Sequence, residues 1–93
     1  MTTVRVAFGR RLRALRREHG VSQYALADRT GLHATVISRF ERGEREPRLK
    51  SILRLAEGLG VPPGTLLDTL VERRLTPEEF DRHFGHLPTD GEG

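Results

Sequence analysis

The sequence predicts an all-α fold, with five short helices in one compact domain and a short sixth helix near the C-terminus. Two observations support this prediction. Apolar residues recur at intervals of three and four positions through most of the chain, which is the spacing of one helix face. A glycine or a proline follows these periodic stretches, so only a few residues remain for each connection. A chain of 93 residues is long enough for one such domain with a tail.

The first predicted helix runs from Val6 to His19. Arginines occupy most of its surface, and Gly20 ends it. Val21, directly after this break, is expected to enter the core. The apolar stripe of the helix, spaced at i, i+4 and i+7, consists of Phe8, Leu12 and Leu15.

The next stretch, from Ser22 to Thr30, predicts a short helix that ends in a tight turn. Ser22 is a suitable N-cap, because its hydroxyl can accept a hydrogen bond from a free N–H group of the first helical turn. Leu26 and Ala27 give this helix a small apolar face. Gly31 follows, and glycine suits the left-handed backbone that commonly succeeds a helix.

A second short helix is predicted from about His33 to Arg42, and Gly43 ends it. Ile37 and Phe40 lie on one side of this helix and are expected to be core residues. Two short helices joined by a glycine turn are the layout of the DNA-binding helix-turn-helix, whose second helix enters the major groove.

Two more helices complete the predicted domain. One spans Leu49 to Gly60, after a charged loop closed by Pro47, and the next spans Thr65 to about Arg74, after a turn that contains Pro62. The wide apolar face expected for the first of these helices contains Leu49, Ile52, Leu53, Ala56 and Leu59.

The sixth helix has a sharply defined start. Thr76 is a predicted N-cap, Pro77 occupies the first helical position, and Glu79 completes a capping box. The helix is expected to reach about His86. The resulting division is a DNA-binding domain over residues 1–67, a helical extension over 68–87 and a disordered tail over 88–93.

The charge of the chain is unevenly distributed. Its net charge is +3, but residues 1–60 hold 13 Arg or Lys against 6 Asp or Glu, whereas residues 61–93 hold 3 against 7. A basic body suits a module that binds a polyanion such as DNA. Because 15 of the 16 basic residues are arginine, biased composition could also explain part of this pattern.

Several function classes find no support in the sequence. The chain has no cysteine, which excludes a disulfide scaffold and a Cys-ligated metal site. No apolar run approaches the length of a membrane span, and arginines interrupt the N-terminus where a signal peptide would be apolar. We find no nucleophile with a base, no paired carboxylates in an apolar setting and no phosphate-binding loop, so we expect neither an enzyme nor a cofactor.

The region from Phe8 to Leu67 resembles the helix-turn-helix domain of the phage-repressor/Cro-like family of bacterial transcription regulators, also called the xenobiotic response element type. The resemblance implies a five-helix lambda-repressor-like fold and double-stranded DNA as partner, and the absence of cysteine fits the expected cytoplasmic location. It rests on Ser22-Gln23, Leu26-Ala27, Gly31, Ile37-Ser38-Arg39, Glu41-Arg42-Gly43 and Pro47, and then on Leu49, Ile52, Leu55-Ala56, Leu59 and Val61.

The resemblance also implies roles for individual residues. Arg16 is expected to form an internal ion pair with Glu41, although it could instead be one more exposed arginine. The expected base-contacting residues are Ala34, Thr35, Ser38 and Arg39. The expected backbone-contacting residues are Gln23, His33, Arg42, Arg45, Arg48 and Lys50.

Ala34 and three arginines of the first helix carry further expectations. Ala34 departs from the family, which often has Arg or Gln there, and alanine can only touch a thymine methyl group, so DNA shape gains weight. Among the arginines of the first helix, Arg10, Arg11 and Arg13 could extend the DNA-binding surface, but we expect at least two of them to be ordinary solvated residues.

Family members usually act as dimers on roughly palindromic operators, and the C-terminal third offers surplus apolar surface. The expected homodimer interface contains Leu70, Val71, Leu75, Phe80 and Phe84. In the competing interpretation, the sixth helix folds back and completes its own core.

The leading functional hypothesis is a sequence-specific transcriptional regulator, expected to be a repressor or a small controller. The alternative is an antitoxin that represses its own operon and binds a toxin, as a protein partner, through the C-terminal third. A third hypothesis is a protein-interaction module that has lost DNA binding, and salt-independent binding would favour it.

Overall fold

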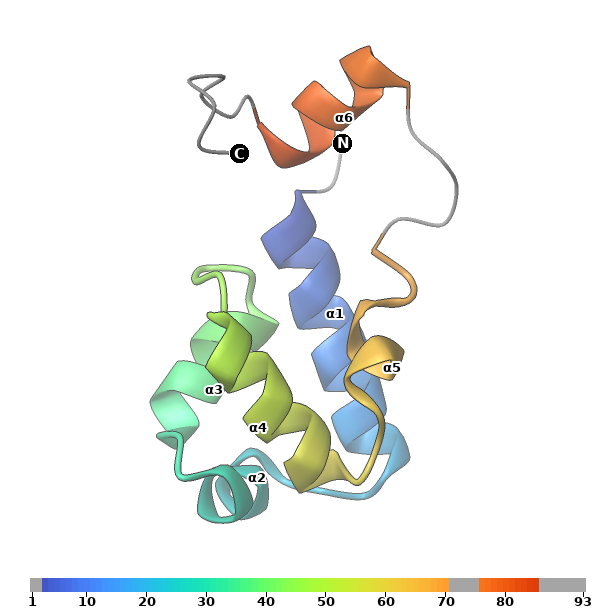
Figure 1. Ribbon diagram of the computed structural model, residues 1–93. Coiled ribbons are helices and arrows are strands. Elements are labelled where there is room, and N and C mark those ends of the chain that lie inside the picture. Colours follow the sequence, from blue (N-terminus) through green and yellow to red (C-terminus); the bar gives the residue numbers. More distant parts are fainter. Residues whose placement is uncertain (1–2, 71–75, 86–93) are drawn as a thin grey trace.

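The computed structural model describes residues 3–70 and 76–85, and these residues form six helices and no strand. The all-α prediction is therefore confirmed. Figure 1 shows α1 running alongside α5, α2 crossing the foot of the molecule, and α6 lying across the N-terminal end of α1. The bounds are α1 Val4–Glu18, α2 Gln23–Thr30, α3 Ala34–Glu41, α4 Leu49–Leu59, α5 Pro63–Leu67 and α6 Pro77–Phe84.

The first five helices share one apolar core. α1 packs against α3 and α5, and α2 packs against α3 and α4. Val21, predicted to enter the core, is buried there at the connection between α1 and α2. The side chains that are almost completely buried come from all five helices and include Phe8, Leu12, Leu26, Ile37, Leu55 and Leu66.

Capping residues set where α1 and α2 begin. α1 starts at Val4, two residues earlier than predicted, because the Thr3 hydroxyl accepts a hydrogen bond from the Val6 N–H at 3.3 Å. α2 starts as predicted, since the Ser22 hydroxyl accepts a hydrogen bond from the Ala25 N–H at 3.0 Å.

The predicted apolar face of α4 was partly wrong. Leu49 and Leu53 are 71% and 48% exposed, whereas Leu55, which the predicted face omitted, is completely buried. The inner side of α4 is centred on Leu55, Ala56 and Leu59. Leucines surround this helix on most sides, so their spacing alone did not determine which side faces inward.

The fifth helix is shorter than predicted and begins earlier. α5 starts at Pro63 and ends at Leu67, so Thr65 lies inside it and not at its start. Proline is well suited to the first helical position, because its fixed φ is already helical and its missing N–H would have no intrahelical partner there. The predicted extension to Arg74 reaches residues 71–75, which lie outside the described residues.

The capping box predicted for α6 is present. The Thr76 hydroxyl accepts from the Glu79 N–H at 3.2 Å, and the Glu79 carboxylate accepts from the Thr76 N–H at 2.9 Å. α6 ends at Phe84, and Gly85 follows with φ +82°. The predicted end at about His86 lies outside the described residues.

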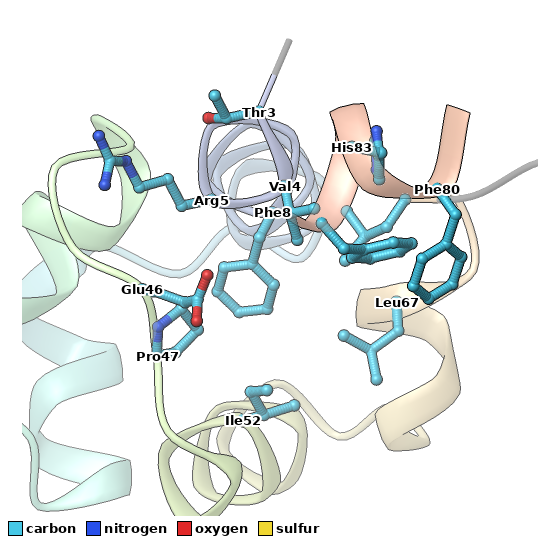
Figure 2. Close-up of a pocket in the computed structure, with 12 residues that line it drawn as sticks. Thr3, Val4, Arg5, Phe8, Glu46, Pro47, Ile52, Leu67, Phe80 and His83 are labelled. Atoms are coloured by element: carbon cyan, nitrogen blue, oxygen red, sulfur yellow. The ribbon is translucent and has the colours of Figure 1, made fainter. Parts of the chain in front are cut away.

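The apolar side of α6 faces α1, α4 and α5 across a cavity of about 610 Å³. The rings of Phe80 and Phe84 have centroids 4.7 Å apart, and Figure 2 shows Phe8, Ile52 and Leu67 pointing into the same space. Phe80 and Phe84 remain 47% and 42% exposed. α6 therefore packs only loosely on the rest of the protein, and Phe80 and Phe84 are not fully buried.

Candidate nucleic-acid interface

The turn between α2 and α3 is held by side-chain and backbone hydrogen bonds. Gly31 adopts φ +77°, and its N–H donates to the Ala27 carbonyl at 2.9 Å. The Thr30 hydroxyl donates to the Leu26 carbonyl at 2.8 Å and accepts from the Leu32 N–H at 3.2 Å. These bonds fix the direction in which α3 leaves α2.

α3 presents one side to the core and the other to solvent. Ile37 and Phe40 hold its inner side, with exposures of 0% and 2%. Arg39 forms no hydrogen bond or ion pair recorded among the described residues, so its guanidinium is available to an external partner. Of the four predicted base-contacting residues, the exposed ones are Thr35 and Arg39 and the half-buried ones are Ala34 and Ser38.

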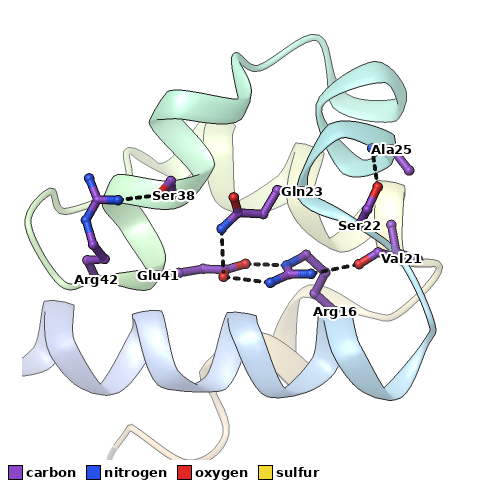
Figure 3. Close-up of polar contacts among 8 residues, drawn as sticks. All are labelled: Arg16, Val21, Ser22, Gln23, Ala25, Ser38, Glu41 and Arg42. Atoms are coloured by element: carbon purple, nitrogen blue, oxygen red, sulfur yellow. Dashed lines mark hydrogen bonds and ion pairs between the residues drawn. The ribbon is translucent and has the colours of Figure 1, made fainter.

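The C-terminal end of α3 is attached to α1 through an ion pair. The structure brings together Arg16 and Glu41, whose side chains form two hydrogen bonds of 2.6 and 2.9 Å (Figure 3). A third Arg16 N–H donates to the Val21 carbonyl at 2.9 Å. The two side chains are only 11% and 4% exposed, and the hydrogen bonds with Glu41 raise the pKa of Arg16.

Gln23 belongs to the same network. Its side-chain amide lies above the ion pair and donates one N–H to a Glu41 carboxylate oxygen at 3.1 Å (Figure 3). A glutamine amide has two N–H donors, so one remains for another acceptor. The network thus fixes the side chain predicted to meet a DNA phosphate at the first position of α2.

Arg42, predicted to contact the DNA backbone, has an internal partner. Its guanidinium donates to both Glu44 carboxylate oxygens, at 2.9 and 3.1 Å, and to the Ser38 hydroxyl. The hydrogen bonds raise the pKa of Arg42 and lower the pKa of Glu44, to which the nearby positive charge of Arg39 also contributes. Part of the Arg42 charge is therefore already compensated before any DNA binds.

The other predicted backbone-contacting residues surround the start of α4 and the start of α3. His33 and Arg48 occupy the N-cap positions of α3 and α4, and neither side chain forms a capping hydrogen bond. Both side chains are exposed, as are those of Arg45 and Lys50. Arg45 lies in the connection that follows the predicted recognition helix, Arg48 and Lys50 lie at the start of α4, and His33 precedes the recognition helix. Positive charge in these places can meet a phosphate backbone.

Two arginines that contribute to the basic composition are engaged elsewhere. Arg11 donates to the Thr65 carbonyl at 2.9 Å and pairs with Asp68 at 3.2 Å, so it fastens α1 to α5. Arg29 donates to the Gly58 carbonyl at 3.1 Å. The sequence could not separate these residues from free cations, because their partners lie far away along the chain.

The residues that build this site lie within the region from which the family of the chain can be assigned. A helix-turn-helix family model matches residues 12–66, which run from α1 through α5. The chain belongs to the helix-turn-helix family. This result confirms the resemblance to Cro-like regulators: the chain is a DNA-binding helix-turn-helix regulator, not an enzyme.

The relatives of this helix-turn-helix chain include small control proteins and a phage repressor. Control protein C.BamHI of Bacillus amyloliquefaciens is 41% identical over 66 residues, which are 70% of this chain and 82% of that protein. The restriction-modification controller protein C.AhdI of Aeromonas hydrophila is 44% identical, with a TM-score of 0.65 over 67% of this chain and 94% of that chain.

The DNA-binding domain of the C2 repressor of Salmonella phage P22 has the same fold, with 34% identity and a TM-score of 0.64 over 72% of this chain and 90% of that fragment. The chain spans 35% of the full-length C2 repressor.

None of the helices described here is both long and apolar enough to cross a membrane.

Proposed function

We propose that this helix-turn-helix protein is a homodimeric, sequence-specific transcriptional repressor or controller that inserts α3 into the major groove of a roughly palindromic operator. The observation that carries the proposal is the outward side of α3. Thr35 and Arg39 are exposed there, and the guanidinium of Arg39 forms no hydrogen bond or ion pair with any of the described residues. The inner side of the same helix is fixed in the core by Ile37 and Phe40.

The chemistry of these side chains suits base recognition. The fork of an arginine guanidinium matches the O6 and N7 acceptors of guanine, so Arg39 is the strongest candidate for direct readout. Thr35 can donate to a base edge or touch a thymine methyl group, and Ala34 can only touch a methyl group. Gln23, His33, Arg42, Arg45, Arg48 and Lys50 are proposed to contact the sugar-phosphate backbone.

Selection from a randomised DNA pool tests this proposal. We expect wild-type protein to enrich a palindromic motif, and Arg39→Ala to lose preference at one guanine of each half-site, a discrimination of about 1–3 kcal/mol. Lys50→Ala is the matched control, because it removes the same charge but should weaken binding uniformly without altering the motif. A motif that survives unchanged in Arg39→Ala would contradict base reading by this helix.

The proposed dimer uses apolar residues near the C-terminal side of the domain. Of the predicted interface residues, Phe80 and Phe84 are 47% and 42% exposed and Leu70 is half-buried against the core. Leu67, which was not predicted for the interface, is 38% exposed and lines the same cavity. Val71 and Leu75, the other two predicted interface residues, lie outside the described residues. Phe80 and Phe84 line the cavity between α6 and the rest of the protein but do not fill it. Large aromatic side chains that stay partly exposed in this way favour a protein partner, and a second copy is the partner that a palindromic operator requires.

Sedimentation equilibrium should show a dimer whose dissociation constant rises about tenfold or more in Phe80→Ser, because aromatic residues dominate interface energetics. Tyr24→Ser is the matched control, since Tyr24 is an exposed aromatic residue of α2 that lies outside the proposed interface. A wild-type chain that stays monomeric at micromolar concentration would contradict the homodimer, and the antitoxin hypothesis would then be preferred.

A further inference from the structure

The polar recess between α1, α2 and α3 is lined by Arg13, Arg16, Gln23, Ser38, Glu41 and Arg42 and has a volume of about 230 Å³. We propose that this recess binds a single phosphodiester of the DNA backbone and that Arg13 supplies its positive charge. This inference rests on the proposed function, because it requires that the protein binds DNA. It adds a DNA contact from α1, which lies outside the two helices of the helix-turn-helix motif.

The position of Arg13 follows from the side of α1 that faces α3. Gly9, Arg13 and Arg16 are spaced at i, i+4 and i+7 and therefore lie on one face of the helix. Gly9 is buried directly against the backbone carbonyls at the end of α3, and Arg16 pairs with Glu41 in the last turn of α3. Arg13, between them, is thus directed along the end of α3 and into the recess.

Among the described residues, two of the three guanidinium groups that line the recess are paired with a carboxylate, and the third, that of Arg13, is not. Arg16 is bonded twice to the carboxylate of Glu41, and Arg42 is bonded twice to the carboxylate of Glu44. Arg13 is exposed and forms no hydrogen bond or ion pair recorded among the described residues. Its full charge is therefore available to an anion, and its fork can bond both free oxygens of a phosphodiester.

The other donors of the recess fit the same ligand. Gln23 has one amide N–H beyond the one bonded to Glu41, and the Ser38 hydroxyl accepts from Arg42 but can still donate. Ser38 belongs both to the recess and to the side of α3 proposed to read bases. The recess therefore borders the proposed groove-binding helix, which is where the phosphates at the edge of a major groove must lie.

The test compares Arg13→Gln with Arg10→Gln, which removes another exposed arginine of α1 that does not line the recess. Binding to the duplex selected from the pool is measured by fluorescence anisotropy over a range of salt concentrations. We expect Arg13→Gln to weaken binding several-fold at physiological salt. The slope of log K against log salt should fall by about 1.8 for the proposed dimer, which is about 0.9 for the one phosphate contact that each protomer loses. Arg10→Gln should leave both quantities unchanged, and neither variant should alter the selected motif.

Replacing single phosphates of the duplex by neutral methylphosphonates then locates the contact. At one position in each half-site, the substitution should weaken binding of wild type and Arg10→Gln but cost Arg13→Gln nothing further. Two results would overturn the assignment of Arg13 while leaving the proposed function intact, provided that wild type binds. One is an equal salt slope for Arg13→Gln and Arg10→Gln. The other is a methylphosphonate penalty that adds to the loss from Arg13→Gln at every position. Failure of wild type to bind any duplex would overturn the proposed function and this inference with it.

Discussion

Gly9→Ala should destabilise the domain strongly, although alanine is the better helix former at an unconstrained position. A Cβ atom at residue 9 would lie 2.2 Å from the Phe40 carbonyl oxygen and 2.8 Å from the Glu41 carbonyl oxygen. Both are backbone atoms at the end of α3, so no side-chain rotation can relieve the overlap. We expect a loss of about 3 kcal/mol, at the upper end of the usual cost of overpacking, which thermal denaturation would record as a melting temperature lower by about 10 °C or more.

Gly64→Ala provides the matched control for this prediction. Gly64 lies in α5 with ordinary negative φ, and a Cβ atom added there meets nothing within 4 Å. This substitution should be neutral or stabilise by about 0.5–1 kcal/mol, because alanine loses less backbone entropy on folding. If Gly9→Ala melts at or above the wild-type temperature, α1 and α3 do not approach as closely as described.

Gly9 also shows what the sequence could not predict. A single glycine in the middle of a periodic helix has no local signal that distinguishes a close helix crossing from a tolerated irregularity. Its role depends on the place where α3 meets α1, more than 30 residues later in the chain. By contrast, the caps at Ser22 and Thr76 were predictable, because a capping residue and its partner lie within three positions of each other.

The same distinction applies to the candidate site. The spacing of Ile37 and Phe40 was enough to predict which side of α3 is buried, and hence which side is free. The availability of each arginine was not predictable, since Arg11 and Arg29 are engaged by partners distant in the sequence and Arg42 is engaged by Glu44 across the end of a helix. The structure therefore distinguishes arginines that already have partners within the protein from those that remain accessible to an anion.

The buried ion pair between α1 and α3 is the second place where one substitution should have a large effect. Glu41→Ala removes the carboxylate that accepts two hydrogen bonds from Arg16 and one from Gln23. Arg16, whose side chain is 11% exposed, would keep its charge with only the Val21 carbonyl as a partner. We expect a loss of about 3 kcal/mol in the free energy of unfolding, measured by urea denaturation, because an uncompensated buried charge is costly.

The double variant Arg16→Met with Glu41→Leu separates two contributions to stability. One is the cost of leaving the Arg16 charge unpaired, and the other is the net stabilisation from the ion pair. The double variant should lose less stability than Glu41→Ala alone, since apolar side chains of similar volume often replace a buried ion pair at little cost. It should nevertheless bind DNA more weakly than its stability implies, because Gln23 would lose the acceptor that orients its amide. The single variants Arg16→Met and Glu41→Leu complete the comparison. If the stability loss of the double variant equals the sum of their two losses, Arg16 and Glu41 act independently, and the pair is not what attaches α3 to α1.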